Sequence, residues 1–156
     1  MSNKYFIDTN VIIDLLNSND NLYVQKLKQL MITDNVELCI NNLVVAEALQ
    51  GIKLQATRQY TKYKQFLMDS FIVISVDNQI IYDSIEIYRL CKSQGVNFNN
   101  ENICPVDNCN RVLFNSIDCI HYATCVKYEL KMLTSDRLFK QIDTVKNFQI
   151  IDTVIN

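Results

Sequence analysis

The chain has 156 residues, of which 49% are apolar and 21% are charged, and its formal net charge is −2. These values are ordinary for one globular domain, and they exclude a polycation that coats nucleic acid through overall charge alone. Long disordered linkers are not expected either, because the chain has only two glycines and one proline.

In chain order, the first part of the sequence alternates predicted strands and helices. A strand is predicted at residues 5–7, helices at 11–16 and 21–31, a strand at 36–40, helices at 43–49 and 57–68, a strand at 71–76, and a helix from 78 to about 92. Asn41 and Asn42 are plausible caps for the third of these helices, and Asp77 for the last.

The pattern changes after Gly95. Residues 97–114 are rich in Asn and contain two cysteines and the only proline, which indicates an inserted loop of unusual length within a single domain spanning residues 1–156. Asn115 and Ser116 then open a predicted helix. The remaining elements are that helix at 117–130, a strand at 131–133, a helix at 135–142 and a last strand at 148–151.

Apolar strands that alternate with helices predict the α/β class, with three α/β/α layers around a central parallel sheet of about five strands. In Rossmann-like sheets of this kind, ligands bind beyond the carboxyl ends of the strands, near the point where the strand order reverses. Functional side chains are therefore expected directly after strands.

Four acidic residues fit that expectation. Asp8 follows the first strand, Asp136 follows the strand at 131–133, Asp118 lies in the first turn of the helix after Ser116, and Glu47 lies within an apolar helix. Although far apart in the chain, these four residues would meet at one end of the sheet.

Each acid also has a purely structural explanation. Asp8 would end a strand with a turn, Asp118 would complement the helix dipole, and Asp136 would be a first-turn acid beside a capping Ser135. Glu47 is harder to explain structurally, because an acid among apolar residues must either face solvent or be compensated. The joint pattern favours a shared site.

Clustered carboxylates repel one another, and a divalent cation relieves that repulsion. Mg²⁺ and Mn²⁺ prefer oxygen ligands. Such ions activate water and neutralise phosphate oxygens, which predicts hydrolysis of a phosphodiester bond.

Four segments resemble the motifs of PIN-domain proteins, in order and in spacing. They are residues 6–14 (FIDTNVIID), 45–47 (VAE), 116–123 (SIDCIHYA) and 133–139 (LTSDRLF). The resemblance covers essentially the whole chain. Within that family, the short form is similar to the VapC toxins of prokaryotic toxin–antitoxin pairs.

This resemblance implies a Mg²⁺- or Mn²⁺-dependent endoribonuclease that is a homodimer, is silenced by a cognate antitoxin, and cuts RNA such as tRNA or rRNA. It carries the catalytic and metal-binding roles over to Asp8, Glu47, Asp118 and Asp136, with Thr9 and Thr134 as hydroxyl contributors. Asp14 belongs to the first motif but lies more than a helical turn from Asp8, so we place it outside the site. The loop at 97–114 departs from the family pattern and leaves substrate choice and antitoxin fit open.

The cysteines and the single histidine have structural explanations as well as functional ones. Cys104, Cys109, Cys119 and Cys125 lack the spacing of a zinc site, so incidental or core cysteines are favoured. His121, one turn after Asp118, would either reach the site or lie on the helix surface, and the surface is favoured.

A basic stretch with interleaved tyrosines suggests contact with single-stranded RNA, although a solvated helix face explains it equally well. Its members are Lys53, Arg58, Lys62 and Lys64, with Tyr60 and Tyr63. The same helix would also suit a dimer or antitoxin contact. Arg111 and Arg137 are further candidates near the mouth of the site.

Two rival functions remain. A haloacid-dehalogenase-like phosphatase needs a second aspartate two residues after the first, and Asn10 stands there instead. A PIN-like module that binds RNA or protein without turnover would be expected to have lost some of the acids. We expect a cytoplasmic enzyme, because the first ten residues show no secretion signal and no run of roughly 20 apolar residues would span a membrane.

Overall fold

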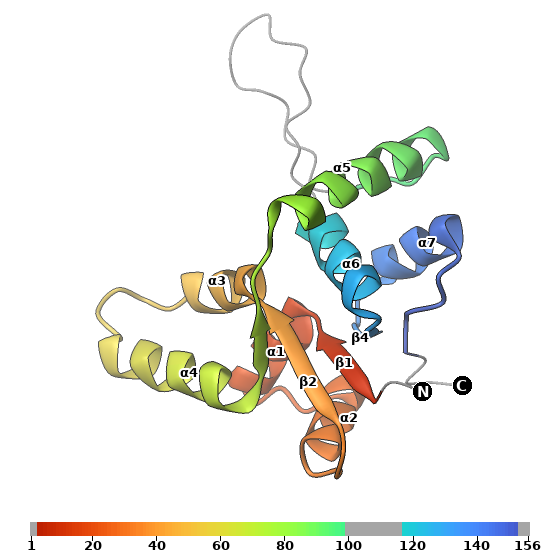
Figure 1. Cartoon of the computed structure of the whole chain (residues 1–156). Coiled ribbons are helices and arrows are strands. Elements are labelled where there is room, and N and C mark those ends of the chain that lie inside the picture. Colours follow the sequence, from red (N-terminus) through yellow and green to blue (C-terminus); the bar gives the residue numbers. More distant parts are fainter. Residues whose placement is uncertain (1–2, 99–116, 153–156) are drawn as a thin grey trace, which may run out of the picture.

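The computed structural model describes residues 3–98 and 117–152. At its centre is a parallel sheet of four strands in the order β3-β2-β1-β4 (Figure 1). The strands are β1 (Lys4–Ile7), β2 (Glu37–Asn41), β3 (Ile72–Ile74) and β4 (Lys131–Leu133).

The sheet has four strands in the described residues rather than the predicted number of about five. Of the segment 148–151, only Ile151 pairs with the sheet, through an isolated parallel bridge to Met132. Asn147 and Gln149 have φ angles of 56° and 54°, and this left-handed conformation interrupts the extended backbone that a strand requires. The predicted loop at 97–114 lies outside the described residues from residue 99 onward.

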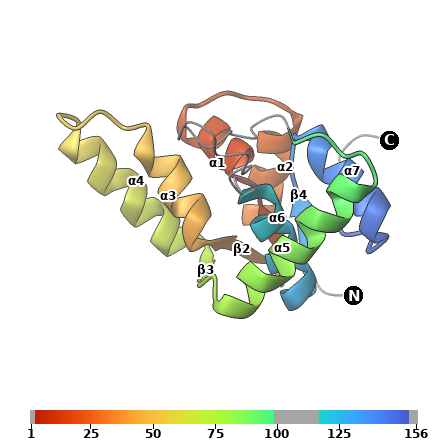
Figure 2. The same cartoon turned by 90° about the horizontal axis from the view of Figure 1, so that it is seen from above.

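Seven helices accompany the sheet in the described part of the chain, and the predicted three-layer α/β/α architecture is confirmed. Figure 2 shows α1 and α2 on one side of the sheet and α5 and α6 on the other. The helices are α1 (Thr9–Leu16), α2 (Leu22–Met31), α3 (Asn42–Gln50), α4 (Thr57–Ser70), α5 (Asn78–Ser93), α6 (Ile117–Tyr128) and α7 (Arg137–Lys146).

The core lies on both faces of the central strands. Phe6 and Ile7 of β1, Ile40 of β2, and Met132 and Leu133 of β4 are completely buried. Adjacent residues of a strand point to opposite faces, so burial of consecutive residues means that both faces are covered. The apolar runs in the sequence therefore mark strands of a covered sheet.

Capping side chains fix where several helices begin. Asn41 accepts a hydrogen bond from the Val44 amide at the start of α3, and Asp77 accepts one from the Ile80 amide at the start of α5, as the sequence predicted. Each cap satisfies a backbone donor that the helix leaves unpaired.

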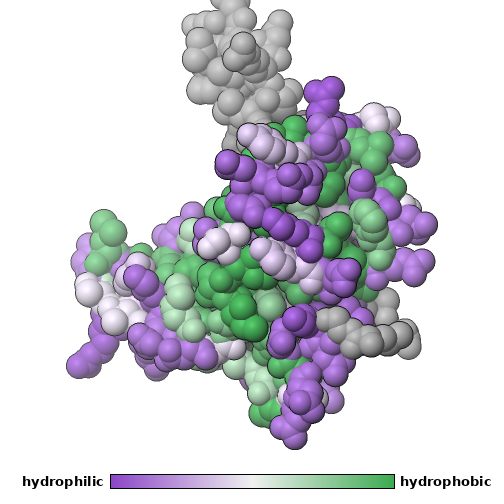
Figure 3. Space-filling model, viewed as in Figure 1, coloured by the Kyte–Doolittle hydropathy of each residue, from purple (hydrophilic) through white to green (hydrophobic). Residues whose placement is uncertain are grey.

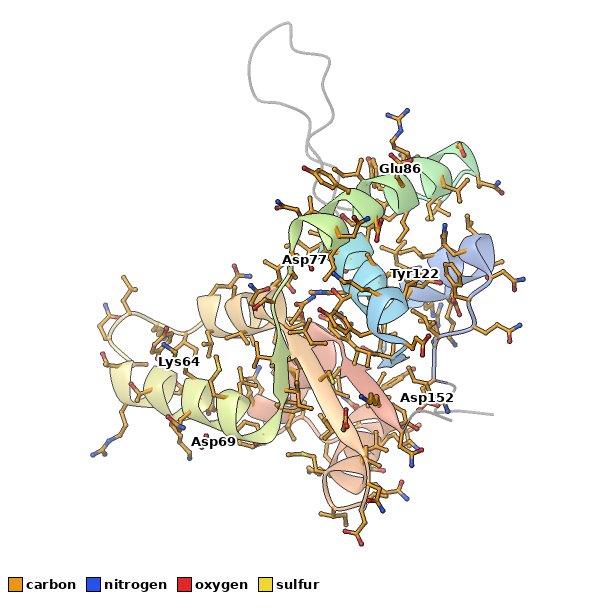
Figure 4. The ribbon with its side chains drawn as sticks, viewed as in Figure 1. Lys64, Asp69, Asp77, Glu86, Tyr122 and Asp152 are labelled. Atoms are coloured by element: carbon orange, nitrogen blue, oxygen red, sulfur yellow. The ribbon has the colours of Figure 1, made fainter. Side chains whose placement is uncertain are left out.

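Two side-chain pairs connect α6 to its neighbours. Tyr122 points from α6 toward α7, where its hydroxyl donates a 2.6 Å hydrogen bond to Asp143 (Figure 4). Asp77 at the start of α5 forms an ion pair with Lys127 near the end of α6. These contacts fix α6, the helix whose first turn carries Asp118.

Hydrophobic side chains gather in the middle of the face shown in Figure 3, over β2 and β3. Ile72 of the edge strand β3 is 51% exposed. In the described part of the chain, no helix has the length and apolar character needed to cross a membrane.

The strand order reverses beside β1. From β1 the chain goes to β2 and β3 on one side, and later to β4 on the other side. The Asp8 amide donates a 3.1 Å hydrogen bond to the Leu133 carbonyl, which continues the pairing just past the ends of β1 and β4. The carboxyl edge at this pair is therefore the expected position of a ligand site.

Candidate active site

A cleft of about 210 Å³ lies at this edge of the sheet. Its lining includes all four acids that the sequence pattern indicated. They are Asp8, Glu47, Asp118 and Asp136. The lining also includes residues that sequence reasoning did not assign to the site, namely Asn10, Ile13, Gln50 and His121, and one that it did, Thr9.

Asp8 is the most buried of these acids, with 2% of its surface exposed. It is the N-cap of α1 and accepts a 2.8 Å hydrogen bond from the Thr9 amide at Oδ1. Its other oxygen, Oδ2, accepts a 2.8 Å hydrogen bond from the Thr134 hydroxyl. Burial raises the pKa of Asp8 above its ordinary value, although these two hydrogen bonds oppose the rise. Both carboxylate oxygens are thus held in a fixed orientation.

Asp136 is held by the same threonine. Its backbone amide donates a 3.0 Å hydrogen bond to the Thr134 hydroxyl oxygen, and its Oδ1 accepts a 2.8 Å hydrogen bond from the Leu138 amide. The structural explanation of Asp136 as a first-turn acid beside a capping Ser135 was wrong, because Asp136 itself caps α7. Thr134 therefore joins two of the acids.

Asp118 lies in the first turn of α6 and is partly buried. Burial raises its pKa to about 6, and the nearby carboxylate of Asp8 adds to this shift, followed by smaller contributions from Asp136 and Glu47. Burial is the larger cause of this shift, and repulsion from the neighbouring acids adds to it. A bound cation would relieve that repulsion.

Glu47 approaches the cleft from α3. Its Oε2 accepts a 2.5 Å hydrogen bond from the Thr9 hydroxyl and lies 3.0 Å from His121 Nε2. Burial would raise the pKa of Glu47, but the hydrogen bonds with His121 and Thr9 outweigh it and lower the pKa below the ordinary value. These contacts explain how a glutamate in an apolar helix remains ionised.

His121 is not on the helix surface, as the sequence analysis favoured, but is buried with 1% exposure. Every residue from Cys119 to Cys125 in α6 is buried. A helix that is apolar on all sides is surrounded by protein rather than water, and the sequence around His121 (DCIHYATC) carries that signal.

The donor set of the cleft fits Mg²⁺ or Mn²⁺, because its acids offer hard oxygen ligands. In residues 3–98 and 117–152, no three His, Cys, Asp or Glu side chains form a preformed metal cage. Mg²⁺ usually keeps several waters and takes only one or two carboxylates directly, so a closed cage is not the expected arrangement.

None of the basic candidates in the described residues lines the acidic cleft. Lys53 lines an adjoining cleft of about 420 Å³ that shares Ile13 and Glu47 with the acidic one. Arg58 and Lys62 are exposed on α4. Arg137 is exposed directly after Asp136, whereas Arg111 lies outside the described residues.

Two other sequence features do not line the acidic cleft. Asp14 accepts hydrogen bonds from Asn19 and Asn21, at the connection between α1 and α2. Cys125 is fully buried, and burial raises the pKa of its thiol. Cys104 and Cys109 lie outside the described residues.

Comparison with known proteins identifies the fold. A family model described as the PIN domain matches residues 5–145. Similar solved structures include VapBC2 from Rickettsia felis bound to a promoter DNA fragment, with a TM-score of 0.68, 16% identity, and coverage of 96% of this chain and 97% of that chain.

FitAcB from Neisseria gonorrhoeae matches with a TM-score of 0.68, 17% identity and coverage of 96% and 97% of the two chains. A toxin–antitoxin complex from Klebsiella pneumoniae matches with a TM-score of 0.64, 17% identity and coverage of 97% and 98%. At these identities the likeness shows the shared fold. Comparison with curated protein sequences gave no significant match.

Proposed function

The chain belongs to the PIN-domain family, and from this premise we propose that it is a metal-dependent endoribonuclease and the toxin of a toxin–antitoxin pair. The observation that carries the proposal is the convergence of Asp8, Glu47, Asp118 and Asp136 on one cleft at the carboxyl edge of the sheet. In a module that binds without catalysing a reaction, nothing would compensate the repulsion among four acids in one cleft.

In the proposed reaction, the four acids would together hold Mg²⁺ or Mn²⁺, with one or two of them as direct ligands. When bound, the cation supplies a nucleophilic water and neutralises charge on the phosphate. Asp8 is oriented for this role by Thr9 and Thr134. Burial and the neighbouring carboxylates raise the pKa of Asp118 to about 6, and a bound cation would stabilise its ionised form.

Exposed basic side chains outside the acidic cleft would bind the RNA backbone. Lys53 lines the adjoining cleft, Arg58 and Lys62 are exposed on α4, and Arg137 follows Asp136. A chain of net charge −2 attracts RNA only through such a local basic surface. The substrate class, tRNA or rRNA, follows from the family resemblance.

Two further proposals rest on the relatives. Two of the similar structures are described as a VapBC assembly and a toxin–antitoxin complex, and they support a cognate antitoxin that silences this chain. A homodimer is proposed from the same resemblance, and the cytoplasmic location expected from the sequence stays a proposal. Sedimentation of the purified chain tests the homodimer.

Cleavage of total RNA by the purified chain tests the enzymatic proposal. Cleavage is expected with Mg²⁺ or Mn²⁺ and should stop when EDTA is added. Asp8→Asn, which keeps the size of the side chain and removes its charge, is the control for a contaminating nuclease. Cleavage that persists in EDTA or in this variant would contradict the proposal.

The toxin proposal has its own test in cells. Induced expression is expected to arrest growth, and Asp8→Asn should remove the arrest. Co-expression of a small DNA-binding protein encoded in the adjacent reading frame should restore growth. Normal growth during high expression of the unmodified chain would contradict a toxin.

A further inference from the structure

Behind Glu47 lies a chain of buried polar side chains that the proposed reaction does not use. His121, Asn41 and Thr124 are almost completely buried, and they come from α6 and from the end of β2. Buried polar groups are costly unless each finds a partner. The partners that these three groups find determine where their protons are.

The donors and acceptors in this series of hydrogen bonds can be assigned starting from the Asn41 side chain. The Val44 amide donates to Asn41 Oδ1 at 3.0 Å, which identifies that atom as the amide oxygen. Asn41 Nδ2 then donates to Thr124 Oγ1 at 3.2 Å and to His121 Nδ1 at 3.0 Å. Thr124 directs its own hydroxyl proton to the Ile120 carbonyl at 2.8 Å.

Because Nδ1 of His121 accepts a hydrogen bond, it carries no proton, and the ring proton is on Nε2. Nε2 lies 3.0 Å from Glu47 Oε2 and therefore donates to it. The Thr9 hydroxyl donates to the same oxygen. Phe6 packs against the imidazole with the ring centroids 5.4 Å apart, which restricts rotation of the ring.

In the described part of the chain, both hydrogen bonds to the Glu47 carboxylate go to Oε2. The side chain of Glu47 is 26% exposed and lines the acidic cleft. With Oε2 engaged by two donors, Oε1 is the oxygen that remains for a ligand in the cleft.

We propose that His121 is a positioning residue, whose Nε2–H tautomer, set by Asn41, holds Glu47 Oε2 so that Oε1 binds the catalytic cation. This inference rests on the proposed metal-dependent function. Hydrogen-bonding partners of a metal ligand typically contribute about 10- to 100-fold to metal affinity, and that is the effect expected here.

The first test compares two substitutions by calorimetric titration with Mn²⁺, a readout separate from activity. Glutamine offers an amide oxygen to Asn41 and an amide N–H to Glu47, whereas leucine offers neither. His121→Leu is expected to weaken Mn²⁺ binding about 10- to 100-fold, and His121→Gln should remain close to the unmodified chain. RNA cleavage by His121→Leu should recover in part at high Mg²⁺ concentration.

Several outcomes would overturn the inference. If folded His121→Leu binds Mn²⁺ as tightly as the unmodified chain, His121 serves only in packing. The same conclusion would follow if His121→Leu and His121→Gln lost Mn²⁺ affinity equally. Such results would leave the nuclease proposal intact. No Mn²⁺ binding by the unmodified chain would overturn both proposals, whereas Mn²⁺ binding without RNA cleavage would overturn the nuclease proposal alone.

The second test needs no substitution and does not depend on the folding of a variant. His121 is the only histidine in the chain, so nitrogen NMR of the untagged protein reports on this ring alone. A protonated Nε2 and an unprotonated Nδ1 are expected, because the Asn41 amide N–H donates to Nδ1. The opposite tautomer, or protons on both nitrogens, would overturn the inference.

Discussion

The Thr134 hydroxyl donates a 2.8 Å hydrogen bond to Asp8 Oδ2, although the two residues are 126 positions apart in the chain. The same hydroxyl oxygen accepts a 3.0 Å hydrogen bond from the Asp136 amide. One buried side chain thus fixes two acids relative to each other, at the ends of the adjacent strands β1 and β4. A shared cation needs this kind of preorganisation, because carboxylates that repel one another would otherwise separate.

Thr134→Val should reduce RNA cleavage about 10- to 100-fold, because it removes the hydroxyl but keeps the shape of the side chain. The Asp8 oxygen and the Asp136 amide would lose a partner, which should also lower the free energy of unfolding by about 1 kcal/mol or more. Single-turnover cleavage and denaturant unfolding measure the two effects. Thr134→Ser retains the hydroxyl and serves as the matched control. Wild-type cleavage by Thr134→Val would show that this link is dispensable.

The raised pKa of Asp118 predicts how the stability of the metal-free protein depends on pH. The folded-state pKa is about 6, above the ordinary value of roughly 3.9 for an unfolded chain. Between these values the folded state binds more protons, so ionisation of Asp118 destabilises the fold as pH rises from about 4 to above 6. Asp8, whose pKa is also raised, acts in the same direction.

Asp118→Asn isolates this effect, because asparagine cannot ionise. In EDTA at pH 7.5 the variant should be more stable than the unmodified chain, by on the order of 2 kcal/mol, or roughly 5 °C in Tm. The difference should shrink toward zero near pH 4. Thermal unfolding across this range measures it. A difference that is independent of pH would mean that Asp118 is not destabilised by burial and neighbouring charge.

Lys53→Ala and Arg58→Ala should raise KM for RNA and leave kcat nearly unchanged. Lys53 lines the cleft that adjoins the acidic one, Arg58 is exposed on α4, and neither lines the acidic cleft itself. Each lost phosphate contact should also reduce the slope of log affinity against log salt by about 0.7. Lys28→Ala on α2 is the control, since Lys28 is exposed, is paired with Asp20, and lines neither cleft. An unchanged salt slope in all three variants would place the RNA elsewhere.

Much of the fold was predictable because each signal is local. Asp8 and Asp136 follow short apolar runs, and residues in that place must lie at the carboxyl edge of a parallel sheet. The cap at Asn41 and the helix start at Asp77 were also predictable, since a capping side chain acts on its own helix. These local rules placed Asp8 and Asp136 at the edge where the cleft lined by all four acids is found.

What the sequence did not predict depends on contacts between distant segments or on backbone conformation. The hydrogen bonds from Thr9 and His121 to Glu47 join α1, α6 and α3, and no local pattern indicates that combination. Similarly, the predicted strand at 148–151 looked extended, yet the positive φ at Gln149 reduces it to a single bridge at Ile151. Residues other than glycine rarely adopt a positive φ, so a glutamine at position 149 did not indicate this conformation.

The most direct test of the account is an anomalous difference map from crystals of the protein grown with Mn²⁺. We expect a peak within the cleft, coordinated by at least one carboxylate oxygen among Asp8, Glu47, Asp118 and Asp136 and by water molecules. A map without a peak in this cleft, from protein that binds Mn²⁺ in solution, would contradict the claim that these four acids share a cation.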